Sequence, residues 1–494
     1  IDDSFITYRY ASNIVAGEGF VYNPGERVLG TTTPFYTLLL AAISSFSGGA
    51  DTPFPTIALI VNALADAGTA LLLWRLGKRL DFPYAGAGAA LIWAIAPYSV
   101  TFAIGGLETS VYVLLLTATV YAYAQEKPSI AALFAGLGLL TRPDALLLLA
   151  PIALDFLLTH LAPRTPHIAS RTSHPAHRTP LIFLTVTLPW YTFATLYFGS
   201  PIPHSVSAKT LAYRLPPTAA LTRFLQHYAT PFLGHLTFGI PWIGIGIILF
   251  PFLTIIGVRA ALRANRRLWP WAIYPWLYLT VFAIANPLIF RWYLTPPLPA
   301  YFFFILIGLE ELVNKADQAR AERGSRSWKP VLLPILIAFP LLMTLRGWTL
   351  TPDHGPTRPA PEMAWIKLEL LYRQAARHVN QDIARESNPS LPVLAAGDVG
   401  VLGYYTDTRI LDTVGLNSPQ TLDYYPLDES LYVINYAIPP DLIRDHQPDY
   451  LVFLEVYGRA GLLKAPFFNE EYVLLHKLPT DIYGSDGMLI YKKE

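Results

Sequence analysis

The sequence contains no cysteine and few charged residues. With no Cys among 494 residues, disulfide frameworks and thiolate metal sites are excluded. Charged residues make up 14% of the chain, whereas soluble domains average about 25%. Hydrophobic residues make up 53%, which is typical of a polytopic membrane protein. The formal net charge of +1 does not indicate nucleic-acid binding, and we expect no nucleic-acid partner.

Ten apolar stretches approach the ~20 residues that a membrane-spanning helix needs. They are 53–76, 84–104, 107–124, 129–140, 145–158, 181–198, 236–258, 269–285, 292–312 and 331–345. The stretches 129–140 and 145–158 are short, and Pro143 between them favours a break. The stretch 33–45 is too short to span, so we expect a helix lying at the membrane interface.

Basic residues orient these stretches across the membrane. If the loop with Asp2 is placed outside and the stretches alternate, every inside loop contains Lys or Arg. This alternation requires a chain reversal at "TRPD" (141–144) and no span at 33–45. We therefore expect an integral plasma-membrane protein whose C-terminal part is extracytoplasmic. The same topology predicts a further transmembrane helix before Ile1.

The composition changes near residue 349. Charged residues become more frequent, and the short runs "LPVLAAGD", "TRILDTVG", "DYLVFLEV", "EYVLLHKL" and "GMLIYKK" are typical of strands. Residues 362–384 have the pattern of an amphipathic helix. We predict an external loop with interfacial helices at 1–52, a transmembrane helical domain at 53–348 and a soluble α/β domain at 349–494.

Two adjacent acids, Asp2 and Asp3, stand in "IDDSFITYRYA" just outside the expected membrane. An aspartate there suits a general base that deprotonates a hydroxyl nucleophile. From spacing alone, a helix cap with a first-turn acid is favoured instead. The stretch "EGFVYNPGERVLGTTTP" that follows is a turn-rich loop.

Further charged residues are expected at the same outer face. Glu108 in "GGLETS" is either a sugar-binding carboxylate or an acid at a helix N-terminus. Arg142 either binds a phosphate or forms an ion pair with Asp144 or another acid. Arg291 begins a span on the outside, where it either binds a lipid phosphate bidentately or extends to the interface.

A third basic cluster lies in "PIPHSVSAKT", which holds His204 and Lys209. Lys209 could hold a phosphate as a point charge, and the alternative is a solvated loop. His204 is the weaker candidate, because no second metal ligand can be named near it.

Residues 2–42 resemble the first external loop of the GT-C-fold glycosyltransferases, membrane enzymes that use sugars linked to polyprenyl phosphate. The residues that carry the resemblance are "DDSFITYRYA", "GEGFVYNPGERVLGTTTP" and "FYTLLLA", and they are most similar to the bacterial branch of arabinofuranosyltransferases and protein mannosyltransferase-like enzymes. Shorter pieces agree in order: "GGLETSVY", "LLTRPDALLL", "PIPHSVSAKT", "RWYLTPPLP" and, in the tail, "GDVGVLGYYTDTRILDTVGLNSP".

The resemblance implies a polytopic GT-C-like α-helical membrane protein with about ten spans here, the first span missing, and a C-terminal soluble α/β domain. It implies a polyprenyl-phosphate-linked sugar donor, with transfer to a glycan, lipid or protein acceptor. It assigns the role of catalytic base to Asp2, with Asp3 in support, and places Lys209 near the lipid phosphate. Membrane lipids are expected partners. No cofactor is required, and a divalent cation is left open.

Two other classes fit parts of the sequence. A lipid or polysaccharide transporter predicts charged residues at mid-membrane and often repeated halves, but acids and bases here gather at the outer face. A membrane-anchored carbohydrate-binding protein would use Trp and Tyr in the tail. The transferase prediction requires Asp2, Glu108, Lys209 and Arg291 to converge.

Overall fold

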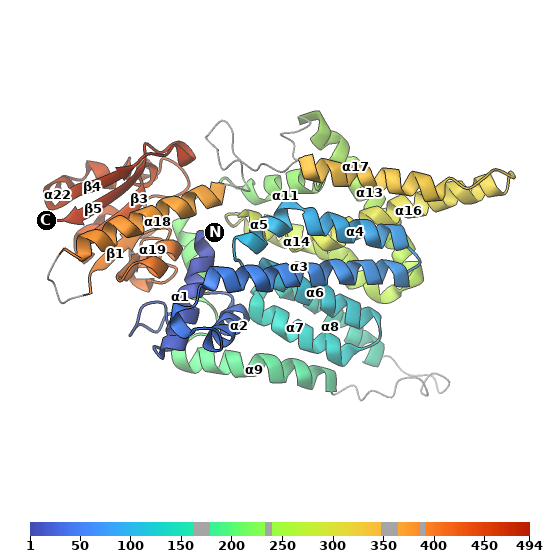
Figure 1. Ribbon diagram of the computed structural model, residues 1–494, viewed down its shortest axis with the longest axis horizontal. Coiled ribbons are helices and arrows are strands. Elements are labelled where there is room, and N and C mark those ends of the chain that lie inside the picture. Colours follow the sequence, from blue (N-terminus) through green and yellow to red (C-terminus); the bar gives the residue numbers. More distant parts are fainter. Residues whose placement is uncertain (162–177, 233–239, 347–363, 386–390) are drawn as a thin grey trace.

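The computed structural model describes residues 1–161, 178–232, 240–346, 364–385 and 391–494. A body of long, roughly parallel helices forms one end of the elongated molecule, and a sheet flanked by helices forms the other (Figure 1). The first residues of the chain lie between these two parts. The predicted domain boundary at 348/349 falls outside the described residues.

The ten predicted apolar stretches are largely helical where the structure describes them, with breaks at Ala96 within 84–104 and at 295–297 within 292–312. Residues 236–239 lie outside the described part. The helices of the first loop and the helical body are α1 (Asp2–Ala16), α2 (Pro34–Ser45), α3 (Phe54–Arg79), α4 (Pro83–Ile95), α5 (Pro97–Ile104), α6 (Thr109–Ala124), α7 (Pro128–Thr141), α8 (Leu146–Leu161), α9 (Arg178–Phe198), α10 (His204–Ala212), α11 (Ala219–Ala229), α13 (Ile240–Ala264), α14 (Trp269–Ala285), α15 (Arg291–Leu294), α16 (Leu298–Ala321) and α17 (Lys329–Arg346).

Fewer of these helices can cross a bilayer alone than the sequence pattern predicts. Among the described residues, four are long and apolar enough: Phe54–Arg79, Arg178–Phe198, Pro241–Ala264 and Arg266–Ala285. A fifth results if α4 and α5, bent by 43° where they meet, are taken as one span. Helix α6 has 16 residues, which reach about 24 Å, less than the ~30 Å of a hydrocarbon core.

Small residues let the long helices touch backbone to backbone. A Cβ added to Gly257 of α13 would overlap the carbonyl of Phe304 in α16, and one added to Gly308 would overlap the carbonyl of Leu253. Such close approach is how apolar helices associate when hydrophobic burial gives little driving force. This packing holds α16 against α13.

The C-terminal part contains a five-stranded sheet, as predicted from its strand-like runs. Its elements are α18 (Ala364–Ile383), β1 (Val393–Ala396), α19 (Gly400–Tyr405), β2 (Arg409–Asp412), α20 (Pro440–His446), β3 (Tyr450–Leu454), α21 (Glu455–Gly458), α22 (Pro466–Glu471), β4 (Tyr472–Leu478) and β5 (Met488–Lys493). The strand order is β2-β1-β3-β5-β4. The pairs β1–β2 and β1–β3 are parallel, and β5 pairs antiparallel with both β3 and β4.

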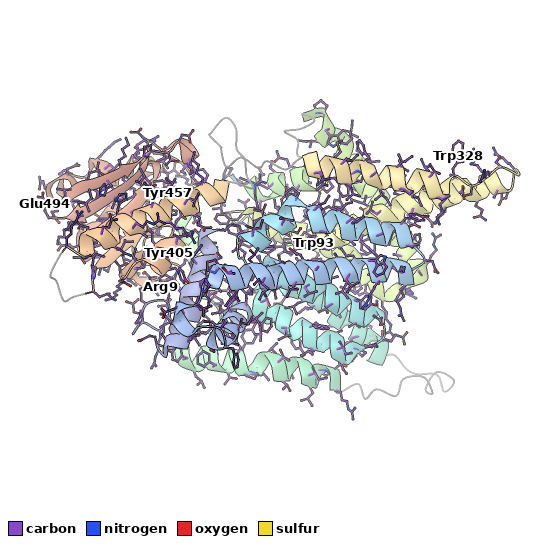
Figure 2. The ribbon with its side chains drawn as sticks, in the orientation of Figure 1. Arg9, Trp93, Trp328, Tyr405, Tyr457 and Glu494 are labelled. Atoms are coloured by element: carbon purple, nitrogen blue, oxygen red, sulfur yellow. The ribbon has the colours of Figure 1, made fainter. Side chains whose placement is uncertain are left out.

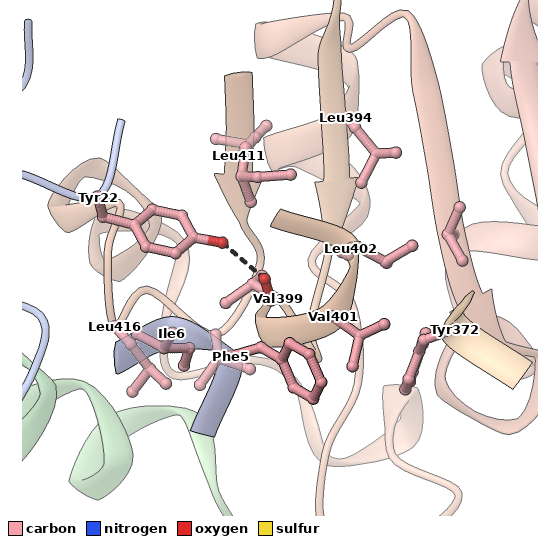
Figure 3. Close-up of a cluster of buried hydrophobic side chains, with 14 of the residues drawn as sticks. Phe5, Ile6, Tyr22, Tyr372, Leu394, Val399, Val401, Leu402, Leu411 and Leu416 are labelled. Atoms are coloured by element: carbon pink, nitrogen blue, oxygen red, sulfur yellow. Dashed lines mark hydrogen bonds between the residues drawn. The ribbon is translucent and has the colours of Figure 1, made fainter. Parts of the chain in front are cut away.

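The first loop and the α/β part share one hydrophobic core. Phe5 and Ile6 of α1 are buried in the same cluster as Val401 and Leu402 of α19 (Figure 3). The division at residues 52 and 349 stays a prediction. The buried core nevertheless joins the segments that precede and follow the helical body in the sequence. The sheet domain therefore bears directly on the conformation of the loop that carries the two acids.

Candidate active site

Asp2 is a buried capping residue for α19. Its Oδ2 accepts the backbone N–H of Gly400 at 2.9 Å, and its Oδ1 accepts that of Val401 at 2.7 Å. A Cβ at position 400 would overlap the carbonyl of Asp2, so only glycine fits there. Burial, together with the charges of Asp398 and Asp3, raises the pKa of Asp2 to about 8, although the two N–H bonds oppose the rise.

Asp3 is placed differently from its neighbour. Its side chain is 34% exposed, and its Oδ2 lies 4.0 Å from Nζ of Lys209, which is 27% exposed. The two residues come from α1 and α10, more than 200 positions apart in the sequence. The capping contact of Asp2 thus fixes the turn of helix that presents Asp3 to Lys209.

Arg9 locks α1 onto the C-terminal part, a role that the sequence did not indicate. Its guanidinium donates to the carbonyls of Tyr22 (2.8 Å), Thr408 (2.9 Å) and Gly403, and to Oδ1 of Asn23. Asn23 in turn bonds both the N–H and the carbonyl of Ile410. Figure 2 places Arg9 at the junction of the two parts of the molecule.

The tyrosine of the "YNPGE" turn makes a second bond across this junction. The hydroxyl of Tyr22 donates to the carbonyl of Val399 at 2.6 Å (Figure 3). Val399 immediately precedes the two residues whose N–H groups bind Asp2. The first loop and the segment after β1 therefore hold each other in one conformation.

Arg142 lies in a buried ion-pair cluster. Its NH1 is 3.1 Å from Glu108, and its Nε is 2.9 Å from Asp144. Tyr278 donates to Asp144 at 2.9 Å, and the guanidinium stacks on the ring of Tyr293. This is the ion-pair alternative for Arg142, and it engages Glu108 as well. Whether either residue also touches substrate stays a prediction.

The residues next to three candidates meet in one small apolar cluster. Ile1, Leu107 and Trp292 pack together with Phe102; each of the first three is the sequence neighbour of Asp2, Glu108 or Arg291, respectively. The structure therefore brings three distant segments of the chain to one place. That the side chains of Asp2, Glu108, Lys209 and Arg291 themselves converge, as the transferase prediction requires, stays a prediction.

Lys209 joins the same region from α10. Its Nζ lies 5.4 Å from the ring centre of Phe290, the residue before Arg291. Burial lowers the pKa of Lys209, but the charges of Tyr293, Asp3 and Glu108 outweigh burial and raise it overall. Lys209 therefore stays protonated, as a phosphate ligand must.

Arg291 lies at the first position of α15, half-buried. Burial is the largest cause that lowers the pKa of Arg223, and the charge of Arg291 lowers it further, so the two cations are close together. Both of them also act on Tyr483, whose pKa is raised by burial and by Asp398. The basic pair and Asp398 thus flank one partly exposed tyrosine.

His204 begins α10, the helix that carries Lys209. Its backbone N–H donates to the carbonyl of Leu29 at 2.8 Å, and its Nε2 is buried without a hydrogen-bond partner in the described part of the chain. Burial lowers its pKa. A role for His204 in substrate binding stays a prediction.

Asp398 is a candidate that the sequence analysis did not select. It follows β1, at the carboxyl end of parallel strands, where binding residues collect in open α/β sheets. Its Oδ2 accepts the hydroxyl of Tyr372 at 2.5 Å. The sequence signal is "GDVG" directly after a strand, although this run lacks the glycine pattern of a nucleotide-binding loop.

A divalent cation has no evident ligand set. Within the described ranges, no group of three or more His, Asp or Glu side chains is placed to hold a metal ion. The candidate acids are instead paired with backbone N–H groups, a lysine or an arginine.

Two family models match the sequence. Residues 31–193 match the dolichyl-phosphate-mannose-protein mannosyltransferase family, and residues 365–491 match a domain of unknown function. No curated protein sequence matches the chain significantly.

Solved structures with the same fold cover nearly the whole chain. ArnT from Cupriavidus metallidurans in the apo state superposes with a TM-score of 0.55 at 13% identity, over 99% of this chain and 92% of that one. Its form bound to undecaprenyl phosphate gives 0.54 at 14% identity, over 99% and 93%. The oligosaccharyltransferase AglB from Archaeoglobus fulgidus, in complex with an inhibitory peptide and a dolichol-phosphate, gives 0.53 at 12% identity, over 96% and 68%. At such identities the likeness shows the fold alone. The predicted helical, membrane-like body and C-terminal α/β part are confirmed, whereas the described residues contain four or five apolar spans and the predicted ten stay a prediction.

Proposed function

We propose that this chain, which has the fold of the GT-C structures and matches the dolichyl-phosphate-mannose-protein mannosyltransferase family over residues 31–193, is a glycosyltransferase. It transfers a sugar from a polyprenyl phosphate to an acceptor hydroxyl at the extracytoplasmic face of the plasma membrane. The observation that carries this proposal is the approach of Asp3 to Lys209, 4.0 Å apart and both partly exposed. A carboxylate for the acceptor and a cation for the donor phosphate then stand side by side.

Lys209 and Arg291 bind the donor phosphate in this proposal. The guanidinium of Arg291 suits two phosphate oxygens, and the ammonium of Lys209 adds a point charge. Both stabilise the negative charge that grows on the phosphate as the bond to the sugar breaks. Arg142 does not bind the phosphate in this proposal, because Glu108 and Asp144 already occupy its guanidinium.

Asp3 acts as the general base. The sequence favoured Asp2, but both oxygens of Asp2 accept backbone N–H groups and its side chain is buried. Asp3 is partly exposed and faces the cation. The carboxylate of Asp3 removes the proton from the acceptor hydroxyl, the oxygen attacks the anomeric carbon, and the polyprenyl phosphate leaves with the bonding electron pair. One displacement of this kind inverts the anomeric centre.

Binding of undecaprenyl phosphate tests the donor half of the proposal. Lys209→Ala and Arg291→Ala should each weaken binding about tenfold or more, the loss expected for one hydrogen bond to a charged group. Lys464→Ala, an exposed lysine of the C-terminal part, is the matched control. Wild-type affinity in both site variants would contradict the assignment. A labelled polyprenyl-phosphate sugar, incubated with membranes that contain the protein, then tests transfer itself.

A further inference from the structure

The carboxyl edge of the C-terminal sheet faces the catalytic loop. Asp398 stands two residues before Gly400, whose N–H binds Asp2, and Asp2 adjoins Asp3. The three carboxylates influence one another electrostatically. Burial is the largest cause that raises the pKa values of Asp2 and Asp398; the charge of Asp398 raises the pKa of Asp2 further, and the charge of Asp3 raises the pKa of Asp398 further. Asp398 is therefore a close neighbour of the proposed base.

Aromatic rings complete the path from Lys209 back to Asp398. Phe290, which lies beside Lys209, has its ring centre 6.3 Å from that of Tyr213. The ring of Tyr213 is 6.0 Å from that of Tyr436. A Cβ at Gly397, the neighbour of Asp398, would lie 3.0 Å from the hydroxyl of Tyr436. These contacts link Asp3 and Asp398 to each other through Lys209 and the rings of Phe290, Tyr213 and Tyr436.

A further tyrosine, Tyr457, packs against this group of residues. The ring of Tyr457, which follows β3, is 5.0 Å from that of Tyr436 at an angle of 72°. The pKa values of Tyr213 and Tyr457 are raised mainly by burial and, second, by the charge of Asp398. Tyr213, Tyr457 and Asp398 are all partly exposed, so all three present surface to a ligand.

Two opposite charges neighbour Asp3. Lys209 attracts a phosphate, whereas the carboxylate of Asp398 repels one. A neutral molecule rich in hydroxyl groups suits the side of Asp398, because its hydroxyls donate to the carboxylate and its C–H faces pack on tyrosine rings. An apolar lipid there would leave a carboxylate desolvated without a partner.

We propose that Asp398, Tyr213 and Tyr457 form an acceptor subsite that takes a sugar, so that the acceptor of the transfer is a glycan. This inference rests on the proposed function, since Asp3 must deprotonate the acceptor. The domain of unknown function then contributes directly to substrate binding. A protein acceptor and a lipid acceptor become outcomes of the test.

The test compares acceptors and variants of the intact protein in nanodiscs. The acceptor probes are methyl glycosides of mannose and arabinofuranose oligomers, a Ser/Thr peptide and a fatty alcohol, with one labelled polyprenyl-phosphate sugar as donor. Asp398→Asn keeps an oxygen for the hydroxyl of Tyr372 and removes only the charge. Asp407→Asn, exposed in the same domain, is the control.

We expect transfer to a glycoside and a rise of about tenfold or more in its KM in Asp398→Asn, with the donor KM unchanged. A merely structural role would move both constants. Transfer to the peptide or the alcohol alone, or an unchanged glycoside KM, overturns the inference and leaves the proposed function standing.

Direct binding separates the two failures. If the wild-type protein transfers nothing, glycoside binding is measured by saturation-transfer difference NMR. Binding that is lost in Asp398→Asn and kept in Asp407→Asn supports the subsite although the proposed function has failed. No binding to the wild-type protein overturns both.

Discussion

Replacing Arg9 by alanine should release the catalytic loop from the C-terminal part. The side chain is 8% exposed and donates to three carbonyls and one amide oxygen. The carbonyl of Tyr22 keeps a donor from Asn13, and Oδ1 of Asn23 keeps the N–H of Ile410. The carbonyls of Gly403 and Thr408 lose this donor.

Each buried acceptor left unpaired costs about 1–3 kcal/mol, so Arg9→Ala should destabilise the junction by about 2–6 kcal/mol. Arg9→Lys should recover only part of this, because an ammonium cannot reproduce the planar fork. Thermal unfolding and limited proteolysis of the detergent-solubilised protein measure the effect. Arg377→Ala, an exposed arginine on α18, is the control.

We expect Arg9→Ala to lower the unfolding midpoint and to expose the α/β part to protease, with transfer lost in parallel. A variant as stable and protease-resistant as Arg377→Ala would refute the reasoning. It would mean that the contacts of Arg9 do not stabilise the packing of the first loop against the C-terminal part.

Three further predictions concern acids of the candidate site. Glu108→Ala leaves Arg142 paired with Asp144 alone and should cost about 1.5–3 kcal/mol in thermal stability, the contribution of one hydrogen bond to a charged group. A loss of kcat/KM at unchanged stability would instead mean that Glu108 binds substrate. Because the pKa of Asp2 is raised from 3.8 to about 8, stability should fall as the pH rises from about 4 through 8, and Asp2→Asn should flatten this profile in unfolding experiments. Burial, with the charges of Asp3 and Asp412, raises the pKa of Asp398 to about 6, so the glycoside KM should fall as the pH rises through 6, and Asp398→Asn should remove this dependence.

Local patterns predicted the elements well, because periodicity and strand-like runs depend on neighbouring residues. All five strands of the C-terminal sheet were predicted, and each apolar stretch is largely helical where it is described. Span number was harder to predict, because hydropathy does not reveal where a helix breaks. The bend between α4 and α5 at Pro97 and the short α6 and α7 are such cases.

The sequence indicated candidate residues and one pairing, that of Arg142 with Asp144, but not the other contacts between them. Asp3 and Lys209 were both selected, yet only the fold reveals that they meet. The role of Asp398 depends on packing between segments almost 400 residues apart, which no local pattern encodes. Arg9 was visible only as part of "RYA", since a buried arginine and a surface arginine look alike in a sequence.

The central claim is that Asp3 is the base, and a single-turnover transfer assay with saturating labelled donor tests it most directly. Asp3→Asn should slow the transfer step by about 10²–10⁴-fold, the usual contribution of a general base, while undecaprenyl phosphate binding persists. Asp51→Asn, exposed at the end of the first loop, should transfer at the wild-type rate. Transfer by Asp3→Asn within a few-fold of the wild-type rate would contradict the account.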